Sequence, residues 1–159
     1  MLFQFFAILG FGAIAFQDIK ERMVYWFLFP MVALFLGFAF WQQSNPKVFL
    51  LFSLTNLFLV STILLISFLY TKYLARKPYL NHSLGLGDLL FFYALAFGFP
   101  TLTFVVLFAS ALIFSLVLHT VLRTSQEKPS VPLAGYMSLF LMVLFLLSHI
   151  HPHIQLYLF

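Results

Sequence analysis

The stretch LGLGDLLFFYALAFGFP, residues Leu84–Pro100, contains the features that decide how this chain folds. It places the carboxylate of Asp88 at the start of an apolar run, directly after a Gly-x-Gly turn. It also interrupts the long apolar stretch Leu89–Leu122 at Gly98 and Pro100, because proline removes a helical donor and glycine tolerates turn geometry. The sequence therefore predicts two helices here, the first of them short.

The composition of the chain is that of an integral membrane protein. Of its 159 residues, 64% are hydrophobic and 8% are charged. A water-soluble domain of this size cannot bury so much apolar side chain. We therefore expect one all-α, polytopic membrane domain over residues 1–159. Cysteine is absent, which excludes disulfides, a cysteine nucleophile and a thiolate metal site.

Six apolar runs predict six transmembrane helices, since a span needs about 20 mostly apolar residues. The expected helices cover Leu2–Gln17, Val24–Trp41, Val48–Tyr73, Leu89–Phe99, Thr101–Leu122 and Val131–Ile150. We interpret the first as a retained helix, because it has no basic segment before it and no small-residue cleavage site. The fourth covers only about 17 Å at about 1.5 Å per residue, so a turn at one of its ends is expected to dip into the membrane.

The basic residues predict the topology. Seven of the eight fall on one side of a six-span protein, and Lys47 alone falls on the other. The seven are Lys20, Arg22, Lys72, Arg76, Lys77, Arg123 and Lys128. This positive-inside pattern puts both termini outside and all four acidic residues at the cytoplasmic face. The four are Asp18, Glu21, Asp88 and Glu127.

Two of these acids, Asp18 and Asp88, are the candidate catalytic residues. A carboxylate at the edge of a bilayer is costly and indicates function by default. Two close carboxylates share one proton, so that one acts as base toward water and the other as acid toward a peptide carbonyl, with no metal or cofactor. The structural alternative is that each Asp caps a helix or pairs with a cation such as Arg22, with Asp88 as the N-cap of the fourth helix. Gly85 and Gly87 lack a β-carbon, so this turn can adopt positive φ and let another backbone approach.

Two short motifs resemble those of the type IV prepilin peptidase family, which includes archaeal preflagellin peptidases and belongs to the GxGD class of aspartic proteases. Its second motif reads roughly Gly-x-Gly-Asp-x-Lys, and Gly85, Gly87 and Asp88 match it. Its first motif reads roughly Asp-x-x-x-Arg-x-Ile-Pro-Asn, and Asp18, Arg22 and Val24 match it. A late Pro-Phe-Gly-like segment of the family is echoed by residues 131–135, which include Pro132 and Gly135.

The chain also departs from this family at three positions. Tyr25 and Trp26 stand where the family usually has Pro and Asn or Asp, and Leu90 stands where it usually has Lys. Both Asp residues that the dyad chemistry needs are retained, and a degenerate relative without activity is the alternative. The lost Lys is expected to change the local electrostatics.

The resemblance implies a GxGD-type bundle and a specific activity. Such enzymes remove a short basic leader from prepilin-like or preflagellin-like proteins at the cytoplasmic face of a prokaryotic inner membrane. It implies Asp18 and Asp88 as the dyad, with Gly85, Gly87, Arg22, Pro132 and Gly135 shaping the site or contacting substrate. Since this face is net basic, anionic lipid headgroups are expected to attract the leader. No nucleic-acid partner is expected, and no methyltransferase activity, because the chain lacks the cysteines and the long loop of the larger members.

Two other functions compete with this interpretation. A small transporter or proton pathway would use the carboxylates as a relay, and a non-catalytic pilus-assembly scaffold would not need them. A metal site at His149, His151 and His153 is disfavoured, because these residues are expected on the outer face and Pro152 disrupts helical spacing. Inside the bundle, Thr55 and Asn56 are interpreted as helix–helix contacts.

Overall fold

The structure is a computed structural model, which describes residues 2–75, 85–122, 131–150 and 156–157. Its six α-helices, in chain order, are α1 (Leu2–Glu21), α2 (Leu28–Trp41), α3 (Pro46–Tyr70), α4 (Leu86–Ala96), α5 (Thr101–Leu122) and α6 (Leu133–Ile150). A π-helical turn, η1 (Thr71–Ala75), extends α3. The described residues contain no β-strand, so the all-α prediction is confirmed.

Four of these helices, namely α1, α3 with the first residues of η1, α5 and α6, are long and apolar enough to cross a membrane. The other two are shorter, with 14 residues in α2 and 11 in α4. The predicted break at Gly98–Pro100 is confirmed, because α4 ends at Ala96 and α5 begins at Thr101.

The second helix begins at Leu28, four residues later than expected. The preceding residues form a turn, in which the Leu28 N–H donates to the Tyr25 carbonyl over 3.1 Å. The Tyr25 N–H in turn donates to the Gln17 side chain of α1 over 3.1 Å. Tyr25 and Trp26 therefore lie exposed in the connection between α1 and α2 and not on a helix.

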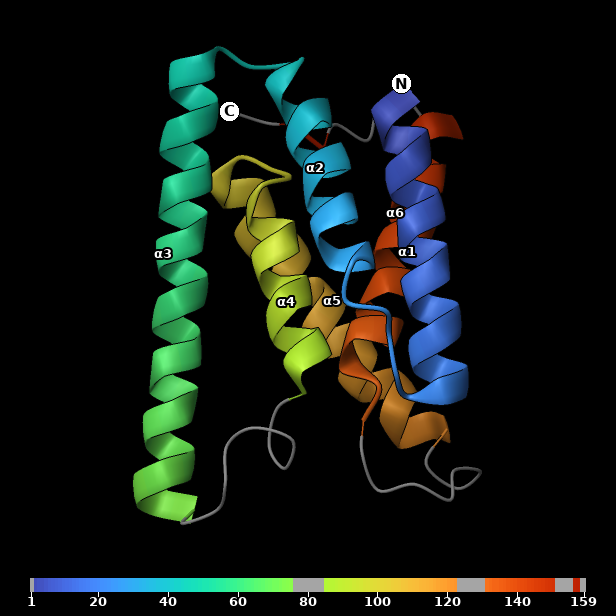
Figure 1. Ribbon diagram of the computed structural model, residues 1–159, viewed down its shortest axis with the longest axis vertical. Helices are drawn as coiled ribbons and strands as arrows, with labels where there is room; N and C mark the ends of the chain where they lie inside the picture. The colour runs from blue at the N-terminus through green and yellow to red at the C-terminus, as the bar shows by residue number, and fades with distance from the viewer. Residues whose placement is uncertain (1, 76–84, 123–130, 151–155, 158–159) are drawn as a thin grey trace.

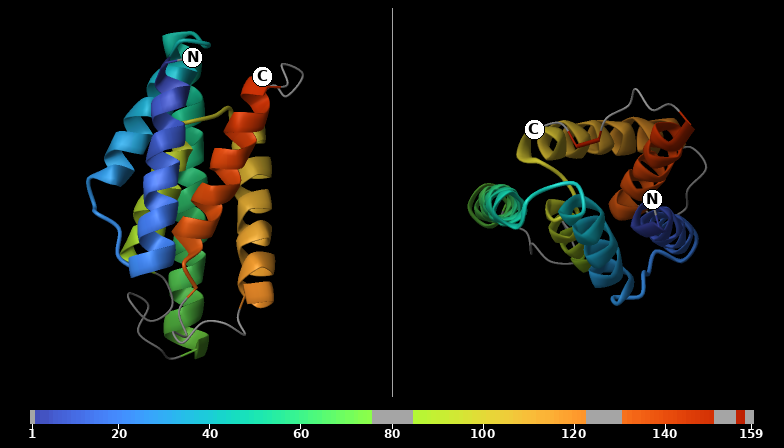
Figure 2. Two further views of the ribbon diagram at one scale, coloured as in Figure 1. Left: turned by 90° about the vertical axis from the view of Figure 1, so that its right-hand side faces the viewer. Right: turned by 90° about the horizontal axis from the view of Figure 1, so that it is seen from above.

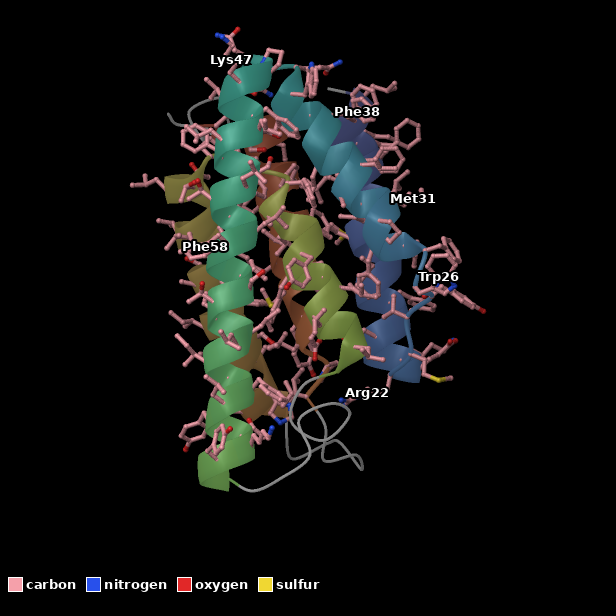
Figure 3. All side chains as sticks on the ribbon, turned by 60° about the vertical axis from the view of Figure 1, so that its left-hand side comes forward. Arg22, Trp26, Met31, Phe38, Lys47 and Phe58 are labelled. Carbon is pink, nitrogen blue, oxygen red and sulfur yellow. The ribbon has the colours of Figure 1, made fainter. Side chains whose placement is uncertain are left out.

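The helices form a bundle in which α1 packs along α6 and α2, while α2 also packs on α4 and α5 on α6 (Figures 1 and 2). Phe11 of α1 joins three helices, because its ring contacts Phe91 of α4 and Phe145 of α6 at centroid distances of 6.2 and 5.8 Å. On the outside, apolar side chains such as Phe58 and Met31 point away from the bundle (Figure 3). Such a surface suits a lipid environment.

One buried polar side chain ties α3 to the break between α4 and α5. Asn56 is fully buried, and its Nδ2 donates to the Ala96 carbonyl over 3.1 Å and to the Phe99 carbonyl over 2.8 Å. These bonds satisfy backbone groups at a helix end inside the apolar bundle. The prediction of a helix–helix contact is therefore confirmed for Asn56. It is wrong for Thr55, whose exposed hydroxyl donates to the Leu51 carbonyl of its own helix.

The described charges lie at opposite ends of the bundle. Lys47 lies near the start of α3, and Arg22 lies at the other end, just after α1 (Figure 3). The end of α1 and the starts of α4 and α6 share the Arg22 end (Figure 1). Four of the basic residues used for the topology prediction, Arg76, Lys77, Arg123 and Lys128, lie outside the described residues.

Candidate active site

The N-terminus of α6 brings Asp18 and Asp88 together. The first N–H groups of an α-helix have no partner within the helix. In α6, the N–H of Ala134 donates to Oδ1 of Asp88 over 2.9 Å, and the N–H of Gly135 donates to Oδ2 of Asp18 over 2.6 Å. Two carboxylates from α1 and α4 therefore bind consecutive backbone amides, at a helix end whose dipole favours negative charge.

Asp18 reaches this position because α1 and α6 approach closely at Gly135. A Cβ at this glycine would lie 2.9 Å from the Asp18 Cβ and 3.0 Å from its Oδ2. Such distances leave no space for a side chain. Gly135 is therefore required for the approach of α1 to α6 and not for an unusual backbone conformation, since no glycine among the described residues has positive φ.

Asp88 also accepts a hydrogen bond from the start of its own helix. Its Oδ2 accepts a hydrogen bond from the N–H of Gly85 over 3.2 Å. The structural alternative in which Asp88 is the N-cap of α4 is therefore wrong. Gly85 occupies the N-cap position in an extended conformation, and Asp88, three residues later, reaches back to the Gly85 N–H as in one half of a capping box.

The two glycines of the Gly-x-Gly-Asp motif provide space. The turn does not use the positive φ that glycine permits, since Gly85 has a φ of −73° and no described glycine has a positive φ. A Cβ on Gly85 would lie 3.1 Å from Oδ2 of Asp88. A Cβ on Gly87 would lie 3.4 Å from Cζ of Phe29 in α2. These glycines therefore shape the surroundings of Asp88 and the packing of α2 on α4.

Arg22 follows α1 directly and is half-buried. Its N–H donates to the Asp18 carbonyl over 3.1 Å, and its φ is 58°. Its positive charge interacts with the Asp18 carboxylate. The charge of Arg22 thus acts on Asp18, as in the structural alternative that pairs Asp18 with a cation, beside the hydrogen bond from Gly135.

Pro132 is buried at the start of α6, where its carbonyl accepts a hydrogen bond from the Tyr136 N–H over 3.1 Å. Pro132 thereby fixes the start of α6. The N–H groups of Ala134 and Gly135, in the first turn, have no acceptor within the helix. Sequence reasoning missed Ala134, since its contribution is a backbone N–H. Its position two residues after Pro132, in the first turn of a helix, was the available signal. Leu90, at the position where lysine was expected, lies exposed on α4.

The surroundings of Asp88 favour its protonated form more than water does. Asp88 lies in α4, outside the four helices that are long enough to span a membrane. Burial raises the pKa of Asp88 to about 6, against the opposing hydrogen bond from Ala134. The negative charge of Asp18 adds to this rise, and the hydrogen bond from Gly85 opposes it. A half-buried acid beside a second carboxyl is the arrangement that general acid–base catalysis by a shared proton needs.

The described residues contain no group of three His, Cys, Asp or Glu side chains that could hold a metal ion. His151 and His153 lie outside the described part of the chain. No family model matches this chain, and neither a curated protein nor a solved structure matches it.

Proposed function

We propose that this protein is a membrane-embedded aspartic endopeptidase with six membrane helices and an Asp18–Asp88 dyad. The observation that carries the proposal is the convergence of the two carboxylates on the consecutive amides of Ala134 and Gly135. Capping of α6 needs one acceptor for each amide, but it does not need two acids from separate helices in a largely apolar bundle. An acid and a base that share a proton do need that arrangement.

The proposed reaction is hydrolysis of a peptide bond. The ionised carboxylate takes a proton from water while the water oxygen bonds to the peptide carbonyl carbon. The protonated carboxyl gives its proton to the carbonyl oxygen, which produces a tetrahedral diol. This diol then returns a hydroxyl proton to the second carboxylate, while the first passes its proton to the amide nitrogen. The C–N bond breaks, and the pair regains its original single proton.

The proposed substrate is a prepilin-like or preflagellin-like membrane protein, from which a short cytoplasmic leader is removed. The similarity of the Asp18–Val24 and Gly85–Asp88 motifs to prepilin peptidases supports this class. The end of the bundle that contains the two acids also has Arg22, with Lys47 at the opposite end, in keeping with a cytoplasmic site in a prokaryotic inner membrane. Anionic headgroups at that face would attract a basic leader.

A cleavage assay in lipid vesicles tests the proposal. The substrate is a prepilin-like protein with a basic leader and a glycine before its hydrophobic helix, and mass spectrometry locates the cut. The matched control is Asp88→Asn, whose side-chain oxygen can still accept from Ala134 but cannot exchange a proton. We expect the wild type to cut at the leader boundary and Asp88→Asn not to cut. Equal cleavage by both proteins would mean that Asp88 is only a helix cap.

A further inference from the structure

Arg22 has a backbone conformation that arginine rarely adopts. Its φ of 58° is the only positive φ of a non-glycine residue among the described residues. It follows the last residue of α1, and its N–H closes a bond to the Asp18 carbonyl four residues earlier. This is the left-handed ending of a helix, a position that glycine usually occupies because a Cβ is disfavoured there. Strained residues of this kind cluster at functional sites.

The charge of Arg22 acts on one member of the carboxylate pair. It interacts with Asp18, whereas the charged neighbour of Asp88 is Asp18 itself. Lys20, also in the last turn of α1, is exposed, and its Nζ lies 5.0 Å above the Phe16 ring. The two carboxyls therefore have unequal surroundings, with a cation beside one and an anion beside the other.

The other elements packed around the pair add few charges. The helix α2 contains no ionisable side chain. The ionisable groups of the other packed helices are Asp88 and Tyr93 in α4, Tyr136 and the distant His149 in α6, and His119 in the last turn of α5. The end of α3 and η1 add the exposed Tyr70, Lys72 and Tyr73. The exposed Glu21 is the remaining described acid at this end of α1. Among the described residues, Arg22 is the cation whose charge acts on Asp18, and the charge that acts on Asp88 is that of Asp18.

We propose that Arg22 is a positioning residue whose left-handed backbone holds its guanidinium beside Asp18, so that Asp18 is the ionised base and Asp88 the protonated acid of the dyad. Burial disfavours a charge on both carboxyls, and both accept backbone hydrogen bonds, one at Asp18 and two at Asp88. The difference between them is the charge of Arg22, which favours a carboxylate at Asp18. The neighbouring Asp18 carboxylate then favours retention of the proton on Asp88. This inference rests on the proposed dyad and assigns its two roles.

Isotope-edited infrared spectroscopy of the protein in lipid vesicles tests the assignment without a substrate. With labelled Asp at about pH 6, the band of a protonated carboxyl is expected in the wild type and in Asp18→Asn, and it is expected to be lost in Asp88→Asn. Adding Arg22→Gly to Asp88→Asn is expected to restore a band, because Asp18 loses its cation. A band that persists in Asp88→Asn and disappears in Asp18→Asn would overturn the assignment.

Cleavage kinetics test the positioning role. Arg22→Gly removes the charge but suits the left-handed backbone, so it is expected to fold and to insert like the wild type. Its acid limb in the pH profile of kcat/KM is expected to move up by about one pH unit, and Arg22→Lys is expected to restore much of the shift. An unchanged profile in Arg22→Gly would overturn the proposal. Absence of cleavage by the wild type would instead count against the proposed function, and the infrared result would still decide the assignment.

Discussion

Gly135→Ala is the substitution for which the site geometry gives the most definite prediction. The new methyl group would lie 2.9 Å from the Asp18 Cβ, 3.0 Å from its Oδ2 and 3.2 Å from Cγ1 of Ile19. Because the Asp18 Cβ is attached directly to the α1 backbone, relief of this clash requires α1 to move relative to α6. The 2.6 Å bond from the Gly135 N–H to Asp18 would then lengthen.

The expected magnitude follows from three opposing effects. Overpacking costs about 1–3 kcal/mol, and weakening a hydrogen bond to a charged group costs up to about 1.5–3 kcal/mol. Replacing a glycine inside a helix by alanine gains at most about 1 kcal/mol. We therefore expect Gly135→Ala to lower the free energy of unfolding by about 2–4 kcal/mol and to abolish most of the cleavage.

Gly37→Ala is the matched control, since Gly37 also lies inside a helix. The nearest atoms to its added Cβ would be 3.8 Å away, in Phe49 and Phe97, which is ordinary contact. We expect this variant to be as stable as the wild type or up to about 1 kcal/mol more stable. Unfolding in mixed micelles, followed by far-UV circular dichroism, measures both variants. If Gly135→Ala matched Gly37→Ala in stability and kept wild-type cleavage, the reasoning about Gly135 would be refuted.

Three further predictions test other parts of the structure. Because burial raises the pKa of Asp88 from 3.8 to about 6, the folded state binds this proton more tightly than the unfolded state. The free energy of unfolding should therefore fall by on the order of 3 kcal/mol as pH rises from about 4 to 7. The same fall in Asp88→Asn would contradict this. Asn56→Ala should cost about 2–4 kcal/mol in the same unfolding assay, because it leaves two backbone carbonyls unsatisfied. Thr55→Ala should change stability by less than about 0.5 kcal/mol. Equal losses in the two variants would be inconsistent with the contact between Asn56 and the end of α4. In this cysteine-free chain, Lys47→Cys should react with an impermeant maleimide in intact cells, and Lys20→Cys should react only after permeabilisation. The reverse pattern would mean that the predicted topology is inverted.

The helices could be predicted from the sequence because their signals are local. Apolar runs and the Gly98–Pro100 interruption define six segments, and the structure has six helices at nearly the same places. The start of α2 could not be predicted, because Tyr25 and Trp26 are apolar enough to continue a run, yet they form the turn after Arg22. Local apolarity does not distinguish a helix from a tight connection at the membrane edge.

The two carboxylates of the candidate site could be chosen from the sequence, but their geometry could not be predicted. A costly carboxylate in an apolar chain indicates Asp18 and Asp88 by itself. Their meeting at Gly135 and Ala134 depends on how α1, α4 and α6 pack, and no local pattern encodes the order of helices in space. The sequence allowed Gly85 two uses, a positive φ and the close approach of another group, and the structure uses only its missing side chain, for space. Sequence alone does not separate these two uses of glycine.

The most direct test of the proposed dyad is the single-turnover cleavage rate of the wild type, Asp18→Asn, Asp88→Asn and the double variant on one prepilin-like substrate. Residues that act as one catalytic unit have non-additive effects. Each single substitution should therefore slow cleavage by at least about 1000-fold, and the double variant should be no slower than either single one. Wild-type rates in either single variant, with correct folding and insertion, would contradict a shared catalytic role for Asp18 and Asp88.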